Sequence, residues 1–299
     1  MSDILIQEAD NGPSDFVLLK SSDGTTSAKV YLFGAHVFSF QVDGQEKLWM
    51  SSLSTMDGSG AIRGGIPIAF PQFADEGPLN MLHGFARESH WKVAEGSHSH
   101  VKLELRNNEK TMSLWPHTFI LSYEVRLRTR GISLALEVMN TDETKDMTFS
   151  GCLHTYFKFD NALDISLHGF RNTAFVDKAD NRKEKIQDGP IEVKAEADRS
   201  AKDASIAHGF VDRIHYYSPS NYIFKKGDKV LYNIEQSESW TDTTVYNPYL
   251  GDKQGPSFPD FDDDGYKYTI CCEPTLSGKH AVTLKPKETW LGTQTITVP

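Results

Sequence analysis

Cysteine is scarce in this chain, with only Cys152, Cys271 and Cys272 among 299 residues. An odd and small number of cysteines does not form the disulfide framework of a small secreted domain. Cys271 and Cys272 are adjacent, so their side chains point to opposite faces if they lie in a strand, and they are then poor ligands for one metal ion. We therefore expect three reduced cysteines, as in a cytoplasmic protein.

Long apolar runs are absent, and positive charge is in deficit. No apolar run reaches the length of about eighteen residues that a membrane-spanning helix needs, so no membrane span is expected. The first residues, Met1–Asp10, lack the basic and apolar regions of a secretory signal, and we expect none. A net charge of −10 argues against a general partnership with nucleic acid or acidic membranes. This net charge does not exclude an anionic small substrate, because a local pair of arginines can dominate the electrostatic field inside a cleft.

Cofactor motifs are also missing. The sequence has no Walker motif, no dinucleotide-binding fingerprint and no EF-hand loop around the acidic run Asp262–Asp264. We therefore expect no nucleotide cofactor and no metal. Calcium at the acidic turn is the alternative to a solvated loop.

Convincing amphipathic helices are lacking, and the best candidate for a short one lies near Asp198–Ala207. The pattern that is present is alternation of apolar and polar residues. It is clearest on both sides of Gly131, where residues 119–127 and 132–138 predict a hairpin with one buried face. Similar alternation occurs in residues 101–105, 147–159 and 266–272.

Many such segments, divided by Gly, Pro, Asn and Asp turns, predict an all-β protein built as a large antiparallel sandwich. All-β folds of this length often form one unit, so we expect a single domain over residues 1–299. The charge-rich segment Asp177–Asp203 is expected to form surface loops.

The segment from Arg63 to Arg87 breaks the strand pattern. Glycines at 64 and 65 allow backbone angles closed to other residues, and prolines at 67 and 71 remove two backbone donors. This composition predicts a stiff, irregular, apolar wall with an arginine at each end, not an interior strand. Two guanidinium groups could hold a dianion such as phosphate. The alternative is a pair of surface arginines that bind nearby carboxylates.

Strand parity indicates where two further residues point. In residues 147–159, Met147, Phe149, Leu153, Phe157 and Phe159 form one apolar face, and His154 projects from the other. In residues 266–273, Glu273 lies on the face opposite Ile270, and Pro274 is expected to end the pairing there. The alternatives are a structural histidine and an ordinary surface carboxylate.

Several motifs in this order resemble those of one family. They are RGGIPIAFPQF (63–73), HGFAR (83–87), SGCLHTYFKF (150–159), GFVDRIHYY (209–217), TTVYNPY (243–249), YTICCEPTL (268–276) and ETWLGTQTITV (288–298). Together they resemble the glucose-6-phosphate 1-epimerases, the hexose-6-phosphate mutarotases of the galactose mutarotase-like superfamily. The resemblance covers most of the chain and implies a galactose-mutarotase type of β-sandwich.

The resemblance also implies residue roles. Glu273 would be the base and His154 the acid that open and close the sugar ring, while Arg63 and Arg87 would hold the 6-phosphate. His83 would lie near the ring oxygen, and Asp212 would accept hydrogen bonds from sugar hydroxyls. The alternatives are a turn histidine at 83 and pairing of Asp212 with Arg213 or another cation. No cofactor is implied.

The sequence departs from the family pattern at Leu82, where some members carry a glutamine that contacts the sugar. Gln72 or Asn80 could supply that contact. The expected function is interconversion of the anomers of a hexose 6-phosphate by a monomer. The alternatives are an aldose 1-epimerase for unphosphorylated sugars and a non-catalytic carbohydrate-binding sandwich. A glycoside hydrolase is disfavoured because the matched motifs supply one carboxylate where two are usual.

Overall fold

The structure is a computed structural model that describes residues 6–7, 15–193, 211–248 and 258–299. Among these residues, every strand pairing is antiparallel. The prediction of an all-β antiparallel protein is therefore confirmed. No helix in the described part of the chain has the length and apolar character to cross a membrane.

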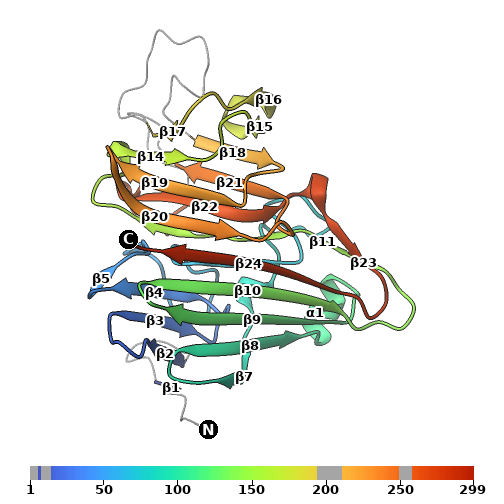
Figure 1. The fold of residues 1–299 in the computed structure, drawn as a ribbon. Helices are drawn as coiled ribbons and strands as arrows, with labels where there is room; N and C mark the ends of the chain where they lie inside the picture. Colours follow the sequence, from blue (N-terminus) through green and yellow to red (C-terminus); the bar gives the residue numbers. More distant parts are fainter. Residues whose placement is uncertain (1–5, 8–14, 194–210, 249–257) are drawn as a thin grey trace.

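One layer is a nine-stranded sheet, whose central strands lie side by side across Figure 1. The last strand, β24 (Thr289–Thr297), pairs with β10 (Gly131–Asn140) and β20 (Lys229–Gln236) and so lies inside the sheet. The predicted hairpin is β9 (Phe119–Arg128) with β10, and Ile132 lies opposite Leu127. In spatial order the strands are β17 (Ile191–Glu192), β14 (Ile165–His168), β19 (Asn221–Lys226), β20 (Lys229–Gln236), β24 (Thr289–Thr297), β10 (Gly131–Asn140), β9 (Phe119–Arg128), β8 (His100–Arg106) and β7 (Lys92–Gly96).

Two further sheets face this layer, and a two-stranded ribbon completes the β structure that is described. The larger sheet is β16 (Lys183–Ile186), β15 (Ala174–Asp177), β18 (Val211–Tyr216), β21 (Asp242–Asn247), β22 (Thr269–Leu276), β12 (Gly151–Leu153) and β6 (Ile68–Ala69), with β13 (Tyr156–Lys158) paired to β22. The smaller is β1 (Ile6–Gln7), β2 (Phe16–Lys20), β3 (Thr26–Tyr31), β4 (Val37–Val42) and β5 (Gln45–Glu46). The ribbon is β11 (Met147–Phe149) with β23 (Val282–Leu284).

The main core lies between these layers. It joins apolar side chains of β2–β4, β8–β10, β13, β19, β20 and β22 in one cluster. For example, the ring of Phe157 on β13 lies 5.0 Å from that of Phe224 on β19 and 5.1 Å from that of Tyr232 on β20. Burial of this apolar surface holds the sheets together.

The described residues include one short α-helix. The candidate at Asp198–Ala207 lies outside the described residues, and the sequence pattern did not indicate α1 (Glu109–Leu114). Asn108 caps α1 by accepting a hydrogen bond from the Thr111 N–H, and the Thr111 hydroxyl accepts one from the Asn108 N–H. Six residues are too few for a helical apolar period, so only this cap could have indicated the helix. Short 3-10 turns occur at η1 (Ala86–Glu88), η2 (Ala162–Asp164), η3 (Lys178–Asp180), η4 (Gly265–Lys267) and η5 (Gly278–His280).

Two strand assignments and one loop assignment also change. Residues 147–159 form three short strands, β11, β12 and β13, and both of their faces are largely buried. Residues 265–267 form the turn η4, so β22 begins only at Thr269. The expected surface loops at 177–203 are wrong for the part that is described, since β16, β17 and η3 lie there. The exposed edge strand β16 buries little, so its sequence carries no alternation.

Candidate active site

The segment Arg63–Arg87 is the irregular wall that its composition predicts. Only two of its residues, those of β6, belong to a strand. Gly65 has a φ of 61°, and a Cβ there would lie 2.4 Å from the Val37 carbonyl oxygen. Gly84 has a φ of 67°, and a Cβ there would lie 2.3 Å from the Phe70 carbonyl oxygen. No other residue type fits these two positions without displacing the backbone beside them.

Gln72 lies inside this wall and is fully buried. Its amide nitrogen donates to the carbonyl oxygens of Leu79 and Met81 at 3.1 and 2.7 Å, and its amide oxygen accepts from the Leu79 N–H at 2.8 Å. These bonds fix the loop that precedes His83. The structure thus gives Gln72 a supporting position and does not place it in the cavity wall.

His83 follows that loop with a φ of 62°. Its backbone N–H donates to the Ala74 carbonyl at 2.8 Å, and its Nδ1 accepts from the Ala74 N–H at 3.1 Å. Burial, followed by the charge of Arg87, holds the pKa of His83 well below its usual value. The ring is therefore neutral, and since Nδ1 is an acceptor, Nε2 carries the proton and can donate it to a ligand.

His154 lies in the connection between β12 and β13. Its backbone N–H donates to the Pro67 carbonyl at 2.9 Å, and its ring stacks on Tyr156 at a centroid distance of 4.6 Å. On its other side, the ring of His83 lies 5.4 Å away in an edge arrangement. These contacts hold the imidazole in one orientation.

Glu273 lies in the middle of β22, so the expectation that Pro274 ends the pairing is wrong. The strand continues to Leu276, with Glu273 opposite Thr244 and Pro274 opposite Thr243. Cys272 donates its N–H to the Thr155 carbonyl at 3.2 Å. N–H groups alternate sides along a strand, so the missing N–H of Pro274 faces the gap between β12 and β13, where its loss costs little.

These elements meet around a cavity of about 290 Å³. Five predicted residues line it together, namely His154, Glu273, Arg63, His83 and Asp212. Gln72 and Arg87 do not line it. The other lining residues are Phe73, Ala74, Leu82, Tyr156, Lys178, Thr244, Tyr246 and Phe258. Segments far apart in the sequence therefore converge on one site, as the matched motifs imply.

The two arginines differ in position. The Arg63 guanidinium lies 3.2 Å from the Asp260 carboxylate and 4.4 Å from the centroid of the Phe258 ring. Arg87 donates from Nη2 to the Leu82 carbonyl at 2.8 Å, and its Nε makes no hydrogen bond but lies 3.7 Å from the Glu88 carboxylate. Arg87 thus supports the cavity rim from behind, while Arg63 forms part of the wall.

Lys178 is a cavity residue that sequence reasoning missed. It begins the turn η3 after β15, and its Nζ lies 3.7 Å from the Asp212 carboxylate and 6.0 Å from the Phe73 ring centroid. Burial raises the pKa of Asp212, and the nearby Lys178 opposes that rise. The buried pair Phe175–Val176 lies just before this turn, but nothing in the local sequence pattern shows that Lys178 faces a cavity.

The acid–base candidates have opposite pKa shifts. Burial raises the pKa of Glu273 to about 8, although a Cys152 S–H bond to its Oε2 at 3.3 Å opposes the rise. Burial and the charges of Arg63 and Arg87 lower the pKa of His154 to about 3. Without substrate, the carboxyl group therefore holds a proton at neutral pH and the imidazole is neutral. Opposite shifts in two adjacent groups are typical of an acid–base site.

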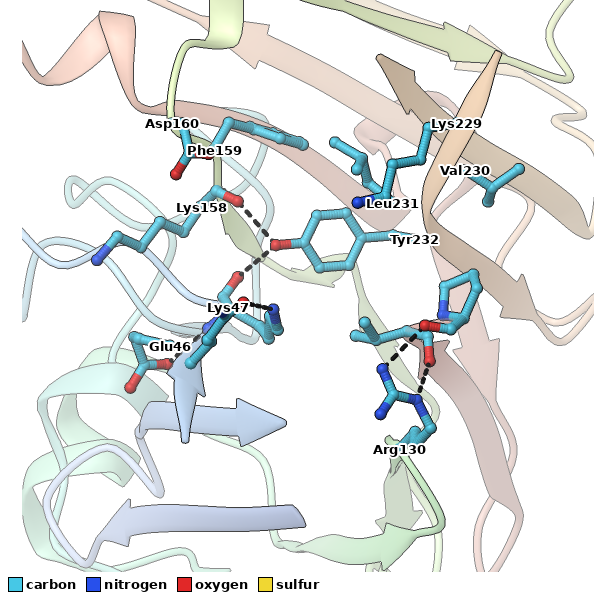
Figure 2. A pocket seen from close by; sticks show the side chains of 13 residues that line it. Glu46, Lys47, Arg130, Lys158, Phe159, Asp160, Lys229, Val230, Leu231 and Tyr232 are labelled. Atoms are coloured by element: carbon cyan, nitrogen blue, oxygen red, sulfur yellow. Dashed lines mark hydrogen bonds between the residues drawn. The ribbon is translucent and has the colours of Figure 1, made fainter. Parts of the chain in front are cut away.

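A larger cavity of about 520 Å³ lies elsewhere, and Figure 2 shows it. The Tyr232 hydroxyl donates to the Lys158 carbonyl at 2.7 Å, and Arg130 donates to the Val298 carbonyl at 3.1 Å. Glu46 accepts from three backbone N–H groups and the Ser39 hydroxyl. None of the predicted site residues lines this cavity, so the smaller one is the candidate active site.

The fold is shared with solved mutarotase-like proteins. A crystal structure of a provisionally assigned mutarotase from Salmonella typhimurium matches with a TM-score of 0.80 at 22% identity, covering 99% of this chain and 96% of that one. A galactose mutarotase related enzyme from Lactobacillus acidophilus matches with a TM-score of 0.70 at 16% identity, covering 95% and 97%. The architecture is therefore a β-sandwich of the galactose mutarotase type, as expected.

The family follows from the sequence comparison. The family model for aldose 1-epimerase matches residues 16–297. A Cenchrus ciliaris protein provisionally named glucose-6-phosphate 1-epimerase is 30% identical over 277 residues, which is 89% of this chain and 79% of that protein. The chain belongs to the aldose 1-epimerase family.

Proposed function

We propose that this chain interconverts the α and β anomers of hexose 6-phosphates, with glucose 6-phosphate as the favoured substrate. One observation carries the proposal: the cations Arg63 and Lys178 line the same cavity as the pair His154 and Glu273. A dianionic phosphate suits the cations, and a ring-opening reaction suits the pair. The provisional name of the Cenchrus ciliaris relative supports this choice of substrate.

The proposed reaction needs two proton transfers. Glu273 takes the proton of the C1 hydroxyl while His154 gives a proton to the ring oxygen. The C1–O5 bond breaks, the open aldehyde turns about its C1–C2 bond, and the reverse transfers close the ring as the other anomer. Neither redox chemistry nor a carbanion is involved, so a positioned acid and base suffice.

Binding of the phosphate has a second role, which is to move a proton from Glu273 to His154. The reactive state has its proton on His154, whereas the lowered pKa of His154 leaves it on Glu273. After burial, the charges of Arg63 and Arg87 are the largest causes of that lowered pKa. A bound dianion offsets these charges and so raises the pKa of His154. Transfer then needs to cross only the 3.2 Å between His154 Nδ1 and Glu273 Oε1.

The remaining predicted residues fit supporting roles. His83 donates from Nε2 toward the ring oxygen or an adjacent hydroxyl, and Asp212 accepts from sugar hydroxyls beside Lys178. Arg87 contributes its charge to phosphate binding from behind the wall, while Gln72 keeps the loop before His83 in place. We further propose that the protein acts as a cytoplasmic monomer and requires no metal or nucleotide, since proton transfers alone complete the reaction.

A second candidate is an aldose 1-epimerase that acts on unphosphorylated sugars. The contact between Arg63 and Asp260 favours it, because that carboxylate already offsets part of the guanidinium charge. Anomer exchange measured by NMR on glucose 6-phosphate and on glucose decides between the two. Faster exchange of glucose would favour the second candidate. No enhanced exchange of either sugar would favour a non-catalytic carbohydrate-binding protein.

A further inference from the structure

Three metal-ligating side chains converge beside the cavity. His154 Nδ1, Cys271 Sγ and a carboxylate oxygen of Glu273 all lie within 4.8 Å of one another. Pairing of Tyr156 on β13 with Cys271 on β22 brings these segments together. The acid–base reaction proposed above uses His154 and Glu273 but gives no role to Cys271.

The strand geometry separates the two adjacent cysteines. Cys271 and Glu273 are two residues apart on β22, so their side chains share one face. Cys271 packs with Trp49, Tyr156 and Phe261, whereas Cys272 belongs to the main core. Cys272 therefore lies on the opposite face and provides a matched control of the same residue type.

The donor atoms suit one class of cation. Imidazole nitrogen, thiolate sulfur and carboxylate oxygen are the ligands of zinc, and in a tetrahedral site they lie roughly 3–4 Å apart. Small side-chain movements bring the observed separations into that range. His154 Nδ1 is buried and has no hydrogen-bond partner, although Glu273 Oε1 lies 3.2 Å away. Its lone pair is thus available, with the ring proton on Nε2. Magnesium and calcium prefer all-oxygen sites with more ligands and fit this set poorly.

We propose that His154, Cys271 and Glu273 bind a soft divalent cation of the zinc type, and that this binding inhibits the enzyme. The cation displaces the thiol proton of Cys271 and the carboxyl proton of Glu273, and both are released to solvent. His154 binds through its Nδ1 lone pair and releases no proton. The fourth position stays open to water.

Inhibition, unlike binding, rests on the proposed function. A carboxylate that binds the cation cannot take the C1 hydroxyl proton, and an imidazole bound through Nδ1 cannot receive the proton of Glu273. Zinc should therefore compete with the sugar, and a high concentration of substrate should relieve the inhibition.

The binding test uses the full-length protein, treated with chelator and then titrated with Co²⁺. We expect a thiolate-to-cobalt charge-transfer band that zinc abolishes. Cys271→Ser and Cys271→Ala should both lose the band, so if one variant fails to fold the other can be measured. Cys272→Ser should retain it. A wild-type protein without the band, or a band that persists when Cys271 is replaced, would overturn the site.

The inhibition test measures anomer exchange with and without Zn²⁺, each variant serving as its own reference. Replacing Cys271 should raise the zinc concentration for half-inhibition at least tenfold, whereas Cys272→Ser should not change it. Equal inhibition of all variants would overturn the proposal, and so would activity that is lost on chelation and restored by zinc. If the band followed Cys271 while no protein exchanged anomers, the cation site would stand and the proposed function would fail.

Discussion

His154 Nδ1 and Glu273 Oε1 lie 3.2 Å apart, inside a cavity whose wall also carries Arg63 and Lys178. The two groups come from different parts of the chain, and burial moves their pKa values in opposite directions. A carboxyl and an imidazole at this distance can exchange one proton without a water molecule between them. The cations nearby make the position of that proton depend on what is bound.

Arg63 is expected to distinguish phosphorylated from free sugar. A charged hydrogen bond to phosphate typically contributes about 1.5–3 kcal/mol, so Arg63→Ala should lower kcat/KM for glucose 6-phosphate roughly 10- to 150-fold. Activity on glucose should change much less. Arg87→Ala should show the same selectivity with a smaller effect, because its Nη2 already binds the Leu82 carbonyl. Equal losses on both sugars would mean that these arginines support the wall and do not bind phosphate.

Lys178 should contribute to the same selectivity. Lys178→Met keeps the length of the side chain but removes its charge, so we expect a loss of about tenfold in kcat/KM for glucose 6-phosphate. Lys183→Met is the matched control, because the side chain of Lys183 is 63% exposed and pairs with Asp180 outside the cavity. Steady-state kinetics on both variants would test the assignment. A loss shared by the control would point to the net charge of the protein.

Glu273 should make stability depend on pH. Folding raises its pKa from 4.5 to about 8, so the folded state holds this proton more tightly than the unfolded state. The resulting stability is fully present below pH 4.5 and is lost as the pH rises to 8. Glu273→Gln removes the titration, so the variant should gain a few kcal/mol relative to wild type over that range. Urea unfolding of metal-free protein at both ends of the range measures the gain. A constant difference between the proteins would contradict the raised pKa.

The sequence revealed the fold class because its strands bury one face. Alternation at residues 119–127 and 132–138 marks β9 and β10, which pair as the predicted hairpin, with Gly131 opposite Arg128. It failed at residues 147–159, where the second face is also largely buried, since Cys152 packs in a second core cluster and His154 and Tyr156 line the cavity. The prediction that Pro274 ends the strand was wrong for a related reason. Strand parity alone cannot show whether the neighbouring segment needs a hydrogen bond from the backbone N–H of residue 274.

The site was predictable as far as motifs identified it. The matched motifs named five residues that now line one cavity, including Asp212, which pattern alone would leave as a surface carboxylate. Lys178 and the contact between Arg63 and Asp260 could not be predicted, because they depend on tertiary proximity across more than thirty residues of sequence. The same holds for the distance between His154 and Cys271, since the pairing of β13 with β22 sets it.

The most direct test is anomer exchange by NMR on equilibrated glucose 6-phosphate, with Glu273→Gln compared to wild type. A positioned base contributes about 10²–10⁴-fold, so the enzyme-catalysed exchange rate should fall by that factor while substrate binding persists. His154→Asn should do the same, and the double variant should lose far less than the product of the two single losses. If Glu273→Gln exchanged the anomers at the wild-type rate, Glu273 would not be the base and the proposed acid–base mechanism would be wrong.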